Sequence, residues 1–139
     1  MAVELRRLGP ADLPLLDHVA EDVFDGPILP DQAVFFLASS GYLLVVALSG
    51  HEVVGQITGM IHRHPDGPPQ LYVDNLGVTP ARQRQGIGRA LIREMIAWGK
   101  SLGCEEAWIA TERQNTPARR LYADSGFAEQ TVAYFERKL

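Results

Sequence analysis

An arginine-rich glycine turn at residues 82–91 reads RQRQGIGRAL, in a chain whose formal net charge is −4. It follows the strand-like run LYVDNLGV and leads directly into a helical pattern. Free backbone N–H groups at the start of a helix bind anions, and glycine lets an anion approach them closely. Arginine side chains add charge-assisted hydrogen bonds. The turn therefore predicts a site for an anion such as phosphate, with a purely structural turn as the alternative.

Neither of two widespread phosphate-binding motifs accounts for this turn. The Rossmann pattern fails because Leu91 fills its third glycine position and the preceding strand is not the first of a βαβ unit. A P-loop fails because no Gly-Lys-Ser/Thr follows the glycines. We therefore expect a phosphate site of another kind.

A second segment with residues suited to catalysis is NTPARRLYADSGF, at residues 115–127. Ala118, Leu121, Tyr122 and Ser125 follow three- and four-residue spacing, which puts Tyr122 on the inward face of a helix. A phenol is a competent acid toward a departing thiolate, although a core aromatic with its hydroxyl at the rim fits the same spacing. Asn115 precedes Thr-Pro, which makes it a good helix cap.

The spacing of apolar residues predicts the helices and strands that must position these residues. It predicts one mixed α/β domain over residues 1–139, with the order β-α-α-β-β-β-α-β-α-β. Strands are predicted over residues 3–8, 42–48, 52–63, 70–78 and 105–112, with one or two more over 128–139. Helices are predicted over residues 11–24, 31–39 (capped by Asp31), 85–102 and 116–126. The third helix has one apolar face, expected to be buried: Ile87, Leu91, Met95, Trp98 and Leu102.

Composition narrows the class of protein. The chain has 139 residues, 46% hydrophobic and 22% charged, which is ordinary for a globular domain. No apolar run approaches the ~20 residues of a membrane helix, the first residues lack the order of a signal peptide, and Cys104 is the single cysteine. We expect a cytoplasmic protein without a membrane partner, and the acidic balance argues against nucleic acid.

The distribution of charge along the chain is uneven. Between Leu8 and His62 there is no lysine or arginine, whereas ten basic residues face seven acidic ones from Leu76 onward. Two solvated surfaces of different composition would account for this pattern. The alternative is a protein that binds a cation on one side and an anion on the other. The acids of the first half are Asp12, Asp17, Glu21, Asp22, Asp25, Asp31 and Glu52.

Two motifs resemble one known family, the Gcn5-related N-acetyltransferases (GNAT). QRQGIGRAL is similar to the family's Gln/Arg-x-x-Gly-x-Gly/Ala signature, and NTPARRLYADSGF is similar to its later Asn-x-x-Ala-x-x-Leu-Tyr-x-x-x-Gly-Phe segment. The resemblance covers nearly the whole chain. It implies a mixed, mostly antiparallel sheet of six to seven strands flanked by four helices. It also implies that the anion is the pyrophosphate of acetyl-CoA.

The resemblance also implies roles for individual residues. Leu76 and Val78 would pair with the pantetheine arm, the Leu76 N–H would lie near the thioester carbonyl, and Tyr122 would protonate the leaving thiolate. The residues that the resemblance assigns to the cofactor are Leu76, Val78, Gln83, Arg84, Gln85, Gly86, Ile87, Gly88, Arg89, Asn115, Ala118 and Tyr122.

Attack on a thioester needs a neutral amine, so an acceptor that binds as an ammonium ion must lose a proton. Asp74 lies two residues before Leu76, where some members of the family have a glutamate with this role. Glu112, at the end of the next predicted strand, would come near Asp74 if the two strands are neighbours. We assign both acids to the acceptor, with Asp74, a water molecule or another group as the base. Either acid would equally serve as a solvated surface group.

The remaining reactive side chains give weaker evidence of function than the two motifs. His62 and His64 would point to the same side of an extended strand, but no third ligand is evident nearby, so no metal is expected. Cys104 is distant from both motifs, which favours direct transfer over an acetyl-cysteine intermediate.

The sequence therefore predicts an acetyl-CoA-dependent N-acetyltransferase that acts on a small primary amine by direct attack. A loose resemblance to the aminoglycoside 3-N-acetyltransferases, together with the acid-rich first half, favours a polycationic acceptor. The alternatives are a protein N-terminal or lysine acetyltransferase and a non-catalytic acyl-CoA-binding module. The length of the acyl chain and the oligomeric state, including a homodimer, stay open.

Overall fold

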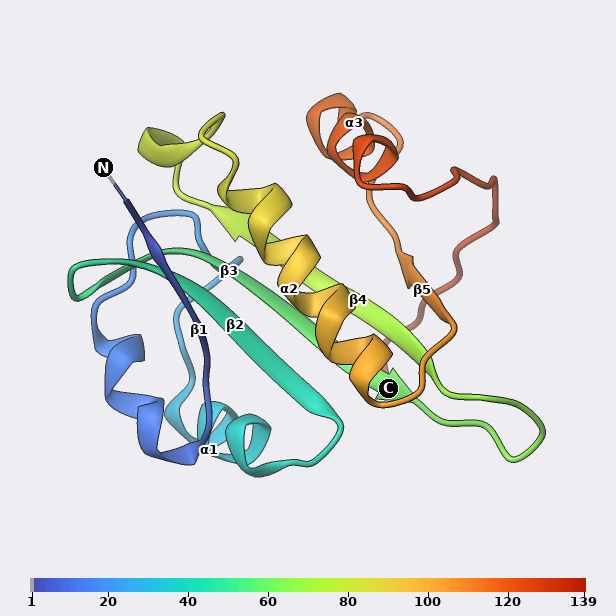
Figure 1. Ribbon diagram of the computed structural model, residues 1–139, viewed down its shortest axis with the longest axis horizontal. Coiled ribbons are helices and arrows are strands. Elements are labelled where there is room, and N and C mark those ends of the chain that lie inside the picture. The colour runs from blue at the N-terminus through green and yellow to red at the C-terminus, as the bar shows by residue number, and fades with distance from the viewer. Residues whose placement is uncertain (1) are drawn as a thin grey trace.

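The computed structural model describes residues 2–139 and has a five-stranded sheet at its centre, in the order β1-β2-β3-β4-β5 (Figure 1). Neighbouring strands are antiparallel except for β5, which is parallel to β4. The strands are β1 (Glu4–Arg7), β2 (Tyr42–Ser49), β3 (Glu52–His62), β4 (Gln70–Val78) and β5 (Glu106–Ile109). The helices are η1 (Pro10–Asp17), α1 (Pro30–Ala38), η2 (Pro80–Arg82), α2 (Ile87–Ser101) and α3 (Thr116–Asp124), of which η1 and η2 are 3₁₀ helices. The expected mixed α/β fold is confirmed.

Two apolar clusters cover the two faces of the sheet. On the first face, Leu91 and Met95 of α2 pack with the buried Ile57 of β3, and Figure 1 shows α2 lying across this part of the sheet. On the opposite face, Leu16 of η1 and Val23 pack with strands β2 and β3. We call these the α2 face and the η1 face. The segment from η1 to α1 carries six of the seven acids of the first half and packs on the η1 face, whereas α2, which follows the arginine-rich turn, packs on the other.

The predicted third helix forms with nearly the expected bounds. Ile87, Leu91 and Met95 are buried, as their spacing predicts, and Trp98 is partly buried against the same cluster. Leu102 differs, because the helix ends at Ser101 and the Leu102 side chain is 42% exposed.

The prediction of a helix over residues 11–24 is wrong in its extent. The 3₁₀ helix η1 ends at Asp17 and contains Pro14, which has no N–H to donate to an α-helical hydrogen bond. Beyond it Val19 forms an isolated parallel bridge with Val53 of β3, and residues 21–26 form turns and bends. Asp31 does not cap α1, because Leu29 holds the cap position and Asp31 lies in the first turn.

The strand or strands predicted over residues 128–139 do not form, so the sheet has five strands rather than six or seven. This segment leaves α3 without any strand arrow in Figure 1. A strand needs a neighbour for its N–H and C=O groups and apolar burial on one face. The segment has neither: Val132 is 77% exposed, Tyr134 79% and Phe135 88%.

Strand β4 has a strand neighbour on both sides in its first half but not in its second half. Thr58 of β3 lies opposite Asn75 while the next residue, Gly59, lies opposite Val73, so Asp74 is the extra residue of a β-bulge. Strand β5 pairs with β4 only as far as Val73. Within the described residues, the edge of β4 from Asp74 to Val78 therefore has no strand beside it on the β5 side.

Gly77 allows the chain to cross closely over this second half of β4. A Cβ atom at Gly77 would lie 2.1 Å from the carbonyl oxygen of Val23, far inside van der Waals contact. Because that neighbour is backbone, it cannot turn aside as a flexible side chain would. Gly77 thus fixes the segment around Val23 against the η1 face of β4.

We expect Gly77→Ala to destabilise the protein by about 3 kcal/mol, the upper part of the range for overpacked sites, because the Val23 segment must lift off β4. Gly67→Ala is the matched control, since a Cβ there has no atom within 4 Å and the expected change is within about 0.5 kcal/mol. Chemical denaturation monitored by circular dichroism measures both. Equal midpoints for the two variants would contradict the close approach at Gly77.

Candidate active site

The glycine turn ends at an uncapped helix N-terminus. Arg84 and Gly86 have backbone φ angles of 64° and 82°, both in the left-handed region, and α2 begins directly afterwards at Ile87. The Ala90 N–H donates to the Gly86 carbonyl, and no side chain caps the helix. The N–H groups of the turn before Ala90 therefore have no acceptor within the helix. They give the turn the donor geometry that the sequence predicted for an anion.

Polar side chains hold the turn in place. Arg82 donates to Ser49 Oγ at 2.5 Å, at the end of β2, and to Gln85 Oε1 at 3.4 Å. Gln83 Nε2 donates to the Val78 carbonyl at 3.1 Å, which ties the turn to the end of β4. Arg84 is exposed at the tip of the turn. The turn thus follows directly from the stretch of β4 that β5 leaves uncovered.

The start of α2 lies close to α3. A Cβ at Gly88 would be 3.2 Å from Leu121 Cδ2 of α3, so the absent side chain points toward that helix. Arg89 is 3.7 Å from Asp124, also on α3. A cavity of about 380 Å³ separates the two helices further along, and Arg89, Arg93 and Lys100 are among the residues that line it. Positive charge therefore extends from the turn along one side of α2.

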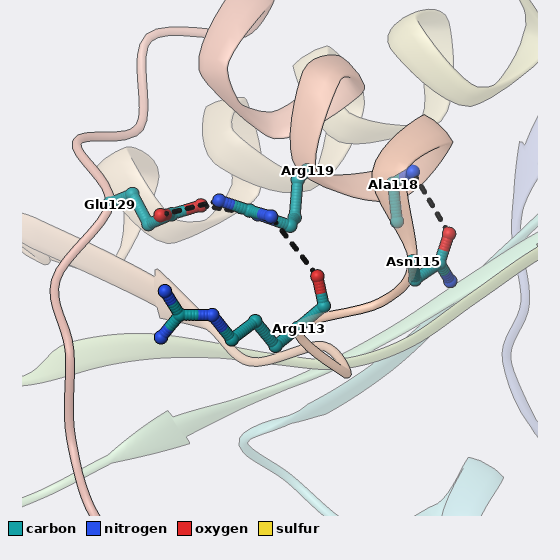
Figure 2. A network of polar contacts seen from close by, with 5 residues as sticks. All are labelled: Arg113, Asn115, Ala118, Arg119 and Glu129. Carbon is teal, nitrogen blue, oxygen red and sulfur yellow. Dashed lines mark hydrogen bonds and ion pairs between the residues drawn. The ribbon is translucent and has the colours of Figure 1, made fainter.

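The first turn of α3 carries the predicted cap. Asn115 Oδ1 accepts a hydrogen bond from the Ala118 N–H at 3.1 Å, which confirms the capping interpretation (Figure 2). Arg119 donates to the Arg113 carbonyl at 3.0 Å and forms two hydrogen bonds with the Glu129 carboxylate. These contacts hold the start of α3 against the segments on either side of it.

Tyr122 faces inward from α3, as its spacing predicts. Its ring packs against the cluster of the α2 face and meets Phe127 edge-on, with ring centroids 6.3 Å apart. Burial raises the pKa of the Tyr122 phenol above its ordinary value. The hydroxyl is therefore protonated at neutral pH, which is the state that a general acid requires.

The bulge residue Asp74 is exposed and lies beside an aromatic pair. Tyr72 of β4 stacks on Trp108 of β5 with ring centroids 4.1 Å apart. Burial, followed by the charge and hydrogen bonding of the Asp74 carboxylate, raises the pKa of the Tyr72 phenol. Asp74 is therefore within reach of the Tyr72 hydroxyl, on the strand that leads to the turn.

The other predicted residues of β4 and β5 lie around the same point. Leu76 and Val78 are partly buried and pack toward the α2 face, on the stretch without a β5 neighbour. Strands β4 and β5 are adjacent, with Val73 opposite Ile109, as the placement of Glu112 required. Strand β5 ends at Ile109, short of the predicted residues 105–112, so Glu112 lies three residues beyond it. Asp74 lies within β4, one residue past the last pair with β5.

A hydrogen-bond chain that the sequence analysis missed lies under the bulge. Gln56 of β3 is fully buried, and its Nε2 donates to the Val23 carbonyl at 3.1 Å and to Asn75 Oδ1 at 2.5 Å. Asn75 Nδ2 in turn donates to Asp25 Oδ2 at 3.1 Å. The signal was present, because Gln56 is a polar residue in the otherwise apolar run VVGQI. Its partners, 19 and 33 residues away, are not readable from spacing.

Gln56 also carries an unsatisfied atom. Its Oε1 is buried and has no hydrogen-bond partner among the described residues. Leaving such an oxygen unpaired costs about 1–3 kcal/mol, whereas an apolar side chain of similar volume would avoid that loss. Packing alone therefore does not explain a glutamine at this position.

The remaining reactive groups lie elsewhere. The rings of His62 and His64 are 4.4 Å apart, as expected from their shared side, and no group of three potential metal ligands occurs within residues 2–139. Cys104 follows the far end of α2 from the glycine turn, and burial raises the pKa of its thiol. No helix in the described part of the chain is long and apolar enough to cross a membrane.

Comparison with known proteins identifies the family that this fold and turn belong to. The model of the Acetyltransferase (GNAT) family matches residues 13–127, so the chain belongs to that family. The match confirms the resemblance carried by the two sequence motifs. The family consists of acetyltransferases, with acetyl-CoA as the acetyl donor.

The chain is similar to several curated N-acetyltransferases. Rattus norvegicus N-acetyltransferase 8B is 30% identical over 105 residues, which cover 75% of this chain and 47% of that protein. Aminoglycoside N(6′)-acetyltransferase type 1 of Acinetobacter haemolyticus is 26% identical over 108 residues, 74% of each chain. The chain thus spans about half the length of some of the curated relatives that it matches.

Solved structures resemble the whole chain. The crystal structure of an aminoglycoside acetyltransferase from an uncultured soil metagenomic sample, in complex with trehalose, superposes with a TM-score of 0.85 and 26% identity. The similarity covers 99% of this chain and 96% of the other. The resemblance to aminoglycoside acetyltransferases is therefore confirmed, although the curated relative is named for the 6′ rather than the 3 position.

Proposed function

We propose that this chain transfers the acetyl group of acetyl-CoA to a primary amine by direct attack of the amine on the thioester. The main support for this proposal is the arrangement of β4 and the start of α2. Strand β4 loses its β5 neighbour at the Asp74 bulge and continues through η2 and the glycine turn into an uncapped helix N-terminus among arginines. An unpaired strand edge suits an amide-containing arm, and the helix start suits the phosphates at the other end of that arm.

In this proposal each part of the donor has its own protein partner. The amides from Arg84 to Arg89, with Gln83, bind the pyrophosphate. The pantetheine arm runs along Leu76 and Val78, with Asn115 and Ala118 of α3 on its other side. The acetyl group then lies near the Leu76 N–H, close to the bulge.

In the proposed chemical step a carbon–nitrogen bond forms and a carbon–sulfur bond breaks. The amine nitrogen attacks the acetyl carbonyl carbon, the Leu76 N–H stabilises the developing oxyanion, and the carbon–sulfur bond breaks. Tyr122 donates its phenolic proton to the thiolate as it leaves, giving CoA and an acetylated amine. Asp74 accepts the proton that the ammonium form of the acceptor must lose, directly or through water.

For the acceptor we propose a small polycationic amine, such as an aminoglycoside. The acidic first half of the chain lies on the η1 face, away from the arginines of the donor site, and this separation of charge supports a cationic acceptor. The relatives named as aminoglycoside acetyltransferases support the same class. Asp74, at the bulge of β4, and Glu112, beyond the end of β5, are the acids proposed to meet the acceptor.

Removing one arginine from the turn tests the donor site. Arg84→Asn deletes a cation while keeping a residue that tolerates the left-handed backbone, so acetyl-CoA affinity should fall by about tenfold, or 1.4 kcal/mol. Arg63→Asn, which removes the same charge beyond the opposite end of β4, should have no effect. Isothermal titration calorimetry measures both. Unchanged affinity in Arg84→Asn would contradict the contribution of its charge. A glutamate at Gly88 is a poorer test, because it would meet α3.

Removing the proposed acid tests the chemistry. Tyr122→Phe keeps the ring in the cluster and removes the proton, so kcat should fall by about 10²–10⁴ while acetyl-CoA still binds. Because burial raises the pKa of Tyr122, the wild-type kcat should not decline near neutral pH through loss of this proton. Tyr42→Phe, on β2, is the control. A fully active Tyr122→Phe enzyme would make Tyr122 a packing residue only.

A panel of amines tests the acceptor class, with sisomicin, spermidine, phenethylamine and a peptide with a free N-terminus compared by thiol release. The polycations should have the highest kcat/KM, and this value should fall as ionic strength rises, because salt screens the acidic face. Asp74→Asn should raise the acceptor KM or lower kcat and leave acetyl-CoA affinity unchanged, whereas Asp66→Asn, in the β3–β4 loop, should change neither.

The panel also separates the alternatives. Preference for the peptide would indicate a protein acetyltransferase, and preference for an uncharged amine would contradict the polycation. A protein that binds acetyl-CoA but acetylates no amine would be an acyl-CoA-binding module. Wild-type kinetics in Asp74→Asn would remove that residue from the mechanism.

A further inference from the structure

The hydrogen-bond chain under the bulge has only one possible direction. It begins at the Val23 carbonyl and ends at the Asp25 carboxylate, and both of these groups accept hydrogen bonds. Gln56 must therefore present its NH₂ to Val23 and to Asn75 Oδ1, which leaves the Asn75 NH₂ for Asp25. The two amides cannot flip without losing these bonds. The chain thus fixes one Asp25 oxygen, Oδ2, relative to β4.

The fixed carboxylate lies next to the proposed reaction point. Asn75, which holds it, stands in sequence between the bulge residue Asp74 and Leu76. The Asn75 side chain lies with the Val23 segment on the η1 face, whereas Leu76 packs toward the α2 face. Asp25 is therefore on the side of β4 opposite the proposed donor site. An acceptor bound there would reach the thioester across the uncovered edge of β4.

Asp25 also lacks a counter-charge. Several acids of this chain have an arginine partner, such as Asp12 with Arg6 and Glu94 with Arg7. Within residues 2–139 no cation pairs with Asp25, which is exposed and has Asn75 as its polar partner. The buried Gln56, with its unsatisfied Oε1, occupies a position where an apolar residue would pack without that loss. An oriented, unpaired carboxylate held from the core is suited to receive a cation.

We propose that Asp25 binds the ammonium group of the amine acceptor, and that Gln56 and Asn75 are positioning residues that hold its carboxylate beside the bulge. This assignment rests on the proposed function, because an amine acceptor is what brings an ammonium group to this face. Asp25 binds the cation, while Asp74 remains the proposed proton acceptor one residue from Asn75.

The principal test removes the charge of Asp25 and keeps its shape. Asp25→Asn should raise the KM of spermidine, and of the best amine of the panel, at least tenfold, and it should weaken the salt dependence of kcat/KM. The dissociation constant of acetyl-CoA and the denaturation midpoint should not change. Asp22→Asn is the matched control. It removes the same charge three residues earlier, at a φ of 60° that asparagine tolerates, and should change KM less than threefold.

Two further variants test the positioning residues. Asn75→Ala should raise the acceptor KM as Asp25→Asn does, and the double variant should add little, because both changes disable one unit. Gln56→Met removes the donor without burying a charge, and should also raise the acceptor KM. A purely structural role would instead lower the denaturation midpoint and leave KM unchanged. If Gln56→Met does not fold, Asn75→Ala still decides the question.

The outcomes separate this assignment from the proposed function. An active wild type with an Asp25→Asn variant whose acceptor KM stays within threefold would overturn the assignment alone. Equal effects of Asp22→Asn and Asp25→Asn would overturn it too, because the general field of the acidic face would then account for both. A wild type that acetylates no amine contradicts the proposed function and this assignment together.

Discussion

Strand β4 takes part in two different pairings, and the rest of the candidate site depends on where the second one stops. From Gln70 to Val73 it has hydrogen-bonded neighbours on both sides, β3 and β5. At Asp74 the bulge shifts the register with β3, and β5 no longer accompanies the strand. Backbone N–H and C=O groups without a partner are costly inside a protein, so this partly buried stretch without a strand neighbour would suit a ligand that brings its own hydrogen-bonding groups.

The glycine turn extends this uncovered edge into a helix N-terminus. Gln83 ties the turn to Val78 and Arg82 ties it to Ser49, so the end of β4, the end of β2 and the start of α2 form one connected unit. The left-handed backbone at Arg84 and Gly86 then turns the chain into α2 with its first N–H groups unpaired. A ligand that follows β4 therefore meets donors and positive charge without crossing the core.

The sheet also keeps two opposite charges apart. Helix α2 packs on one face of the sheet, and the segment that carries Asp22 and Asp25 packs on the other. Gly77 lets that acidic segment approach β4 closely, and Gln56 anchors it from the interior. One strand thereby lies between a basic surface and an acidic one. The linear separation of charges along the sequence becomes a separation across the sheet.

The sequence by itself determined the elements and motifs that rest on local rules. The apolar face of α2, the hairpin of β2 and β3, the Asn115 cap and the inward side of Tyr122 all follow from spacing of a few residues, because local hydrogen bonds and side-chain direction set them. The family motifs are equally local. These features were predicted correctly, except that Leu102 lies beyond the end of α2 and is exposed. The first helix was predicted too long, because Pro14 and the pairing of Val19 with β3 shorten it.

The tertiary structure alone decided which distant groups meet. The bulge at Asp74 depends on the register with β3, and the chain from Gln56 through Asn75 to Asp25 joins three segments that no periodicity connects. Residues 128–139 have the alternation of a strand but no neighbour to pair with, so their pattern did not become a strand. The register of a strand and the identity of its neighbours depend on contacts between remote segments. This is because a strand is stable only when another strand pairs with its backbone N–H and C=O groups.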